Sequence, residues 1–244
     1  MKSVVIGGTA GLGRELAVQL AIRGDTLLIT GRDQLDLDAC VSDLQFRFGA
    51  TVQGITVEAL HQKNYLKSLR FAADRFGEIN NLFLPIGASN TRDDGNQEFA
   101  EVNGVLSSNF ISVVLAIQAF QPHFKTTEKV EIVGFSSIAA IRGRSVNVVY
   151  AASKRALESY FESLKLSNLK TNVSVKCYRI GYLDTHQSYG KSLLFPKTDL
   201  RQAAKYLINA QYRKHSVSYY PRYWQVLAFL IRILPPEIYK KISK

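Results

Sequence analysis

Cysteine is scarce in this chain of 244 residues, which contains only Cys40 and Cys177. Their spacing matches neither a disulfide framework nor a metal-ligand cluster, so we expect a reducing compartment, the cytoplasm, and no metal site. The chain starts without a basic segment followed by a long apolar core, and no signal peptide is therefore expected. No apolar run approaches the ~20 residues that cross a bilayer, so the sequence also predicts no membrane-spanning helix.

Acidic residues are outnumbered, because 20 Asp and Glu stand against 31 Lys and Arg, and the net charge is +11. This balance favours anionic partners such as phosphorylated cofactors, acidic substrates, membrane surfaces or nucleic acid, and does not choose among them. The basic residues are scattered rather than gathered on one helix, so we do not expect nucleic acid as a partner. Repeats and low-complexity linkers are missing too, and the length suits one α/β domain.

Apolar, β-branched runs alternate with amphipathic patterns of helical period along the chain. Strands are predicted over 3–6, 26–30, 51–57, 81–86, 130–137, 172–178 and 216–220. Helices are predicted over 14–23, 35–48, 63–76, 101–124, 150–165 and 199–212. This alternation predicts a single parallel sheet with helices on both faces and right-handed crossovers.

A glycine-rich turn, Gly7-Gly-Thr-Ala-Gly-Leu-Gly13, joins the first predicted strand to the first predicted helix. Glycines allow a tight turn and a close approach of backbone to ligand, and the N-terminus of the following helix attracts a pyrophosphate. The sequence therefore predicts a dinucleotide site built from the turn residues Gly7, Thr9, Gly11, Leu12 and Gly13. A turn without a ligand is the alternative, and the flanking strand and helix disfavour it.

Arg32 follows the second predicted strand, where dinucleotide folds that prefer NAD carry an acid. A guanidinium there matches a 2′-phosphate, and Arg14, just after the glycine turn, is placed to assist. The sequence therefore favours NADP(H), with NAD(H) as the alternative. On that alternative, Arg32 is a solvated loop residue and Asp33 caps the next helix.

Tyr150 and Lys154 lie four residues apart near the start of a predicted helix, so their side chains share one face. An ammonium group beside a phenol lowers the phenol's pKa from its usual ~10, which makes Tyr150 a usable acid or base at neutral pH. Ser137 precedes Tyr150 by thirteen positions and is placed to donate a hydrogen bond to the same substrate oxygen.

Ser137, twelve intervening residues and then Tyr150-x-x-x-Lys154 resemble the catalytic pattern of the classical short-chain dehydrogenase/reductase family. The resemblance implies a Rossmann-type doubly wound parallel sheet in a three-layer α/β/α domain. It implies that a nicotinamide passes hydride to a carbonyl carbon while Tyr150 protonates the oxygen and Ser137 polarises it. Lys154 would also grip the nicotinamide ribose, and the reverse reaction would oxidise a secondary alcohol. A homodimer or homotetramer is implied as well.

Further residues take roles from this resemblance. Asn109 matches a catalytic asparagine that holds a water near the lysine, and Glu58 stands where the family has an acid beside the adenine. Gly87 and Gly181 match family glycines at the cofactor, and Thr185 matches the threonine that binds the nicotinamide amide. Without the resemblance, Asn109 is a polar residue on a helix flank and Glu58 a helix-entry acid. Residues 186–197 would form a lid over the cofactor.

The chain departs from the family pattern at Leu84 and Pro85, where asparagines are usual. Their loss favours a competing function, a non-catalytic NAD(P)-binding sensor or scaffold of the same fold. The complete set of Ser137, Tyr150 and Lys154 opposes it. Leu157, Phe161 and Leu164 on the helix of Tyr150 face either the sheet or a partner subunit.

The segment from Pro221 to Lys241 combines apolar residues with a rim of arginines and lysines. It suits a helix lying at a membrane interface, with aromatics such as Trp224 at headgroup level, or a helix packed on its own domain or a sister subunit. With Ile141-Arg-Gly-Arg144, it resembles more loosely the bacterial reductases of a decaprenylphosphoryl 2-keto-pentose. This implies a keto sugar on a polyprenyl phosphate and peripheral contact with the inner membrane face, and a soluble ketone or a 3-ketoacyl thioester is the alternative substrate.

We therefore predict one domain, 1–244, in three parts. Residues 1–128 form mainly the cofactor-binding half and 129–220 the catalytic and substrate half. Residues 221–244 form an amphipathic helical tail.

Overall fold

Seven parallel strands form one sheet in the computed structural model, which describes residues 1–58, 62–89, 93–168, 171–184, 195–209 and 217–242. The strands are β1 Lys2–Ile6, β2 Thr26–Gly31, β3 Val52–Thr56, β4 Asn81–Leu84, β5 Val130–Ser137, β6 Val173–Ile180 and β7 Val217–Tyr220. Their order is β3-β2-β1-β4-β5-β6-β7, with every neighbouring pair parallel. The predicted doubly wound parallel sheet is confirmed.

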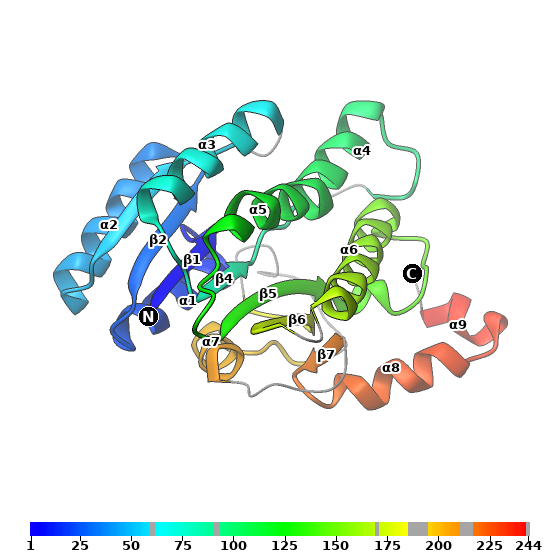
Figure 1. Ribbon diagram of the computed structural model, residues 1–244. Coiled ribbons are helices and arrows are strands. Elements are labelled where there is room, and N and C mark those ends of the chain that lie inside the picture. The colour runs from blue at the N-terminus through cyan, green and yellow to red at the C-terminus, as the bar shows by residue number, and fades with distance from the viewer. Residues whose placement is uncertain (59–61, 90–92, 169–170, 185–194, 210–216, 243–244) are drawn as a thin grey trace.

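Helices cover both faces of the sheet (Figure 1). They are α1 Gly11–Ile22, α2 Gln34–Phe48, α3 Gln62–Phe76, α4 Phe99–Leu106, α5 Ser112–Phe120, α6 Val148–Ser167, α7 Leu200–Asn209, α8 Trp224–Ile233 and α9 Pro236–Ile242. One core cluster joins α1, α2 and α7 to the sheet, and a second joins α3, α5 and α6. Val4 and Val5 are both fully buried and belong to opposite clusters, as the twofold period of a strand requires.

The strand order reverses beside β1, because the chain winds outward to β3 and then returns to β4 on the other side of β1. In sheets of this kind, ligands bind where the order reverses, beyond the carboxyl ends of the strands. The glycine-rich turn after β1 and the segments after β4, β5 and β6 all emerge at this edge.

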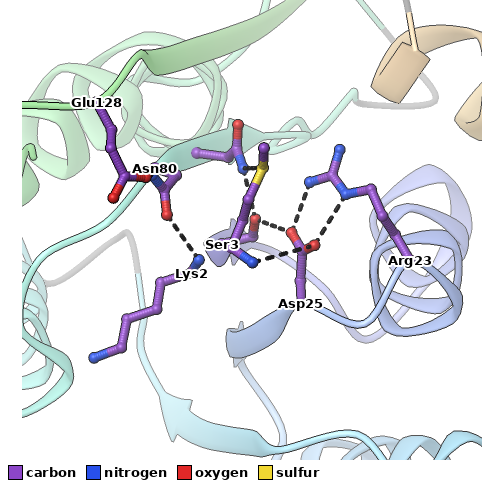
Figure 2. Close-up of polar contacts among 8 residues, drawn as sticks. Lys2, Ser3, Arg23, Asp25, Asn80 and Glu128 are labelled. Atoms are coloured by element: carbon purple, nitrogen blue, oxygen red, sulfur yellow. Dashed lines mark hydrogen bonds and ion pairs between the residues drawn. The ribbon is translucent and has the colours of Figure 1, made fainter.

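The opposite edge, at the amino ends of the strands, is closed by polar contacts (Figure 2). Asp25, whose side chain is 2% exposed, accepts two hydrogen bonds from Arg23 at 2.9 and 2.6 Å and one from Ser3 Oγ at 2.5 Å. Asn80 donates to Glu128 at 2.8 Å. The bond from Ser3 to Asp25 joins the starts of β1 and β2, and the bond from Asn80 to Glu128 joins the starts of β4 and β5. Asp25 also gains the partners that a buried charge needs. This edge therefore has a structural role.

The long helix predicted over 101–124 is interrupted. A π-helical turn, η1 Ser107–Ile111, separates α4 from α5, and a short 3₁₀ turn, η2 Gln121–His123, follows. Together these elements form a helical run over 99–123 of 25 residues, long and apolar enough to cross a membrane by length and composition. The prediction that no apolar run approaches the length of a membrane-spanning helix is therefore wrong. Because Val113, Ala116, Ile117 and Phe120 are buried in the core, we interpret the run as a core helix.

The helix of Tyr150 faces the sheet with its apolar residues. Leu157 and Phe161 are buried in the core cluster, and Leu164 packs against the same cluster. The choice between sheet and partner subunit is therefore settled in favour of the sheet for these side chains.

The tail consists of two helices, α8 and α9, which extend from the edge of the sheet beyond β7 (Figure 1). Trp224, expected at headgroup level, is only 2% exposed, and this expectation is wrong. Its ring packs edge-on against Tyr182 and Phe195, with centroids 5.7 and 4.9 Å away. Gly181 leaves room for it, since a Cβ there would lie 2.2 Å from the indole nitrogen. The tail is therefore anchored beside the carboxyl end of β6.

Candidate active site

Tyr150 stands in the first turn of α6, just beyond the loop that follows β5. The helix starts after Asn147, which has a left-handed backbone and gives no side-chain cap. Asp93 supplies the cap, because its carboxylate accepts hydrogen bonds from the backbone N–H groups of Val149 and Tyr150 at 2.9 and 2.8 Å. Burial opposes ionisation of Asp93, yet these bonds hold its pKa below the ordinary value. Asp93 therefore fixes the backbone of Tyr150.

Burial raises the pKa of the Tyr150 phenol above its ordinary value. A side-chain hydrogen bond with Ser137, at the end of β5, and the charge of Arg144 lower it part of the way back. The prediction that Lys154 lowers this pKa is wrong here, because burial dominates and the ammonium group is held elsewhere. Tyr150 is therefore protonated at neutral pH and is equipped to donate a proton.

Lys154 lies one turn after Tyr150 on α6 and is 4% exposed. Its Nζ donates to the backbone oxygens of Ile86 at 3.1 Å and Phe135 at 2.9 Å, which belong to the segments ending β4 and β5. Burial lowers the pKa of Lys154 to about 8, while the neighbouring carboxylate of Glu158 acts in the opposite direction. Lys154 therefore joins two strand ends at the floor of the site.

Asn109 is fully buried within the π-helical turn η1. Its side-chain amide brackets Ala88, accepting from the backbone N–H at 3.1 Å and donating to the carbonyl oxygen at 2.7 Å. A Cβ at Gly87 would lie 3.0 Å from Asn109 Oδ1 and 3.2 Å from Lys154 Nζ. The structure thus brings Asn109, Gly87 and Lys154 together, and the π turn follows a common pattern at functional sites.

A cavity of about 430 Å³ opens at this edge of the sheet. Among its described lining residues are Leu12, Gly87, Ser137, Tyr150, Lys154 and Gly181. A larger hollow of about 970 Å³ lies between α6, β7 and α8, and none of the predicted site residues lines it. We therefore place the chemistry in the smaller cavity.

The glycine-rich turn has the shape that a dinucleotide requires. Gly7 has φ +88°, and a Cβ at Gly13 would lie 1.9 Å from the backbone oxygen of Gly7. Ala10, before α1, provides no side-chain cap, so the first N–H groups of the helix are free of that competition. Gly11, with φ +52°, and Leu12 open this helix. The residues present fit a bound pyrophosphate.

Thr9 packs against the end of β2, where a Cβ at Gly31 would lie 2.5 Å from Thr9 Cγ2. Arg32, the next residue, is exposed at the same end of the site. Asp33 accepts from the backbone N–H of Asp36 at 2.9 Å, so its predicted capping role is confirmed.

Arg14 is engaged by Asp43, which Arg47 also binds at 2.6 Å. Because the carboxylate of Asp43 already binds the guanidinium of Arg14, it competes with the 2′-phosphate that Arg14 was predicted to help bind. Glu58 is exposed just after β3, and Gly181 lines the cavity after β6. Thr185 and most of the expected lid, 186–194, lie outside the described residues.

Sequence reasoning missed Asp93 and a buried ion pair behind the site, and it quoted Arg144 only as part of the looser resemblance, without a role in the site. Arg179 on β6 donates to both carboxylate oxygens of Glu158 at 2.6 and 2.5 Å, and Ser136 Oγ donates to Glu158 at 2.6 Å. An arginine and a glutamate inside apolar runs were the only local signal. Their pairing depends on how α6 lies on β6, which the sequence pattern does not give.

Comparisons with known proteins agree with this arrangement. The family model for short chain dehydrogenases matches residues 2–192. The chain is 28% identical over 181 residues to an uncharacterised oxidoreductase of Myxococcus xanthus, covering 74% of this chain and 71% of that protein. It is 30% identical over 214 residues to retinol dehydrogenase 8 of Homo sapiens, covering 81% and 66%. A short chain dehydrogenase from Burkholderia cenocepacia, solved in complex with NADP, has a TM-score of 0.77 at 21% identity, covering 88% and 93%.

Proposed function

Because the chain belongs to the short chain dehydrogenase family, and is thus an oxidoreductase, we propose that it reduces a carbonyl group with NADP(H) and with Tyr150 as the proton donor. The observation that carries this proposal is the meeting of Tyr150 and Ser137 in one cavity, at the sheet edge where the glycine-rich turn emerges. The competing sensor function finds less support, because a protonated phenol that lines a cavity beside a serine hydroxyl serves proton transfer.

Each residue of the site has its own role in the proposed reaction. A bound nicotinamide supplies the hydride in reduction and accepts it in oxidation. Ser137 donates a hydrogen bond that holds and polarises the carbonyl oxygen, and Tyr150 passes its proton to that oxygen. Lys154 holds the backbone after β4 and within β5 in place through its two hydrogen bonds. Asn109 fixes the backbone of Ala88 beside it, at the start of a path for protons from water.

We propose NADP(H) as the preferred cofactor because Arg32 is exposed at the end of β2 with no acid in its place. The NADP complex of the Burkholderia relative supports this preference. In wild type, NADPH is expected to bind at least ~10-fold more tightly than NADH, because a guanidinium–phosphate pair is charge-assisted. Arg32→Gln should cut that ratio below ~3 without changing NADH binding. Calorimetric titration of each cofactor measures both, with Arg201→Gln on α7 as the control, and an unchanged ratio in Arg32→Gln contradicts the preference.

We propose a keto sugar on a polyprenyl phosphate as the substrate, delivered at a membrane surface. The looser subgroup resemblance of Ile141-Arg-Gly-Arg144 and the tail supports it. On α8 the side chains of Val226, Phe229 and Ile233 are 64, 63 and 61% exposed beside basic residues. Such a face favours an anionic membrane.

Phe229→Asp should therefore abolish flotation with vesicles of anionic lipid, because it places a carboxylate within the apolar face. Phe46→Asp, at a phenylalanine on α2 that is 92% exposed, makes the same charge change elsewhere and should float like wild type. If wild type does not float, or both variants float equally, the membrane contact is refuted.

A homodimer or homotetramer in the cytoplasm completes the proposal. The family resemblance supports the assembly, and the two free, buried cysteines agree with a reducing compartment. Light scattering of the native protein would show a monomer mass if the assembly is wrong.

A further inference from the structure

The active-site cavity has an unbalanced charge. Among the described residues that line it, the charged ones are Arg144 and Lys154, and both are cationic. No carboxylate stands among those lining residues. A small cavity with two cations and no described acid favours a negatively charged occupant.

The two cations differ in what holds them. The ammonium group of Lys154 donates hydrogen bonds to two backbone oxygens, at 3.1 and 2.9 Å. Within the described residues, no hydrogen bond or ion pair engages the guanidinium of Arg144, and its Nε is buried without a partner. A buried donor without a partner costs free energy, so a ligand that accepts from it gains affinity.

Two charged residues of the same region, Arg142 and Asp93, have partners other than Arg144. Arg142, two residues earlier, is engaged elsewhere, because its Nη1 donates to the backbone oxygens of Ile231 and Leu234 at 3.0 and 2.6 Å and its guanidinium stacks 4.3 Å from the ring centroid of Tyr239. The carboxylate of Asp93 is used by the backbone of α6. Arg142 thus holds the loop against α8 and α9 while Arg144 remains on the cavity wall.

We propose that Arg144 binds an oxyanion of the substrate, a carboxylate or a phosphoryl group, while the carbonyl of the same molecule meets Tyr150 and Ser137. This inference rests on the proposed reductase function and names the substrate class, an anionic carbonyl compound. The planar guanidinium can grip either oxyanion with two parallel hydrogen bonds. Such a grip orients the carbonyl toward the proton donor, which raises the rate through positioning.

Two matched pairs of ketones test the assignment. One pair is 4-oxopentanoate and its methyl ester, and the other is hydroxyacetone phosphate and hydroxyacetone. Wild type should prefer the anionic member of at least one pair, and the pair that shows the preference identifies carboxylate or phosphate. Arg144→Gln should lower kcat/KM for that anionic ketone by about 10- to 100-fold more than for its neutral partner, the value of a charge-assisted hydrogen bond, because any effect of the lost charge on Tyr150 acts on both ketones alike. Arg144→Lys should fall between, and Arg201→Gln, whose side chain is 72% exposed on α7, should match wild type.

Binding measurements separate this inference from the proposed function. Calorimetry with each probe, in the presence of NADP⁺, should show that wild type binds the anionic member more tightly and that Arg144→Gln loses the difference, even where no ketone is turned over. Equal binding of anionic and neutral probes by wild type overturns the inference without any variant. Weaker NADPH binding in Arg144→Gln with unchanged probe binding assigns the guanidinium to the cofactor and also overturns it. If the proposed function itself is wrong, the result is different: the protein turns over none of the ketones and does not bind NADPH.

Discussion

Gly13→Ala is expected to weaken NADPH binding by at least ~100-fold. The added methyl group would lie 1.9 Å from the backbone oxygen of Gly7 and 2.9 Å from its carbonyl carbon. These are backbone atoms of the turn itself, so no side-chain rotation can relieve the contact. The turn must open, and the N–H groups at the start of α1 then leave the positions that a pyrophosphate needs.

Gly143→Ala is the matched control, because a Cβ there meets nothing within 4 Å and it should bind NADPH like wild type. Calorimetry gives the dissociation constants, and circular dichroism and thermal melting report whether each variant is folded. A folded Gly13→Ala protein that binds NADPH within about threefold of wild type would refute the dinucleotide role of the turn.

Tyr150→Phe is expected to lower the turnover number for carbonyl reduction by about 10²- to 10⁴-fold, the usual contribution of a positioned general acid. The change removes only the hydroxyl that carries the proton, and the ring and the Asp93 cap of α6 stay in place. The NADPH dissociation constant should therefore remain within about threefold of wild type. Stopped-flow loss of NADPH absorbance with a saturating ketone measures the effect.

Tyr160→Phe provides the control for this change. Tyr160 lies ten residues later on the same helix, packs edge-on against Phe110 at 6.2 Å and, like Tyr150, has its pKa raised by burial. It does not line the active-site cavity, so its variant should turn over normally. Equal activity of the two variants would show that the phenol of Tyr150 is not the proton donor.

Local sequence patterns predicted the frame of this molecule. Each of the seven strands was located by an apolar run, and the spacing of Tyr150 and Lys154 gave their common helix face. The glycine-rich turn was also readable, because positive φ at Gly7 and the close approach at Gly13 admit hardly any other residue. These features depend on a few neighbouring residues, which explains the success.

Contacts between distant segments could not be predicted in this way. Asp93 caps a helix that starts 55 residues later, and nothing in the sequence around it distinguishes it from a loop acid. The ammonium group of Lys154 meets the backbone oxygens of Ile86, just after β4, and Phe135 in β5, and carbonyls carry no sequence signature. Trp224 is buried because Gly181 makes room for it, so its place depends on a residue more than forty positions away.

The central claim is that Tyr150, protonated at neutral pH, exchanges the proton of this reaction. Because burial raises its pKa, the phenolate needed for alcohol oxidation is scarce at neutral pH and grows by ~10-fold per pH unit below that pKa. The most direct test is the pH dependence of kcat/KM for oxidation by wild type, compared with Tyr150→Phe. The account predicts a rate that climbs through neutral pH and still climbs beyond pH ~9 in wild type, with no such climb in the variant. A wild-type rate that levels off below pH ~8, or a variant that follows the wild-type profile, would contradict it.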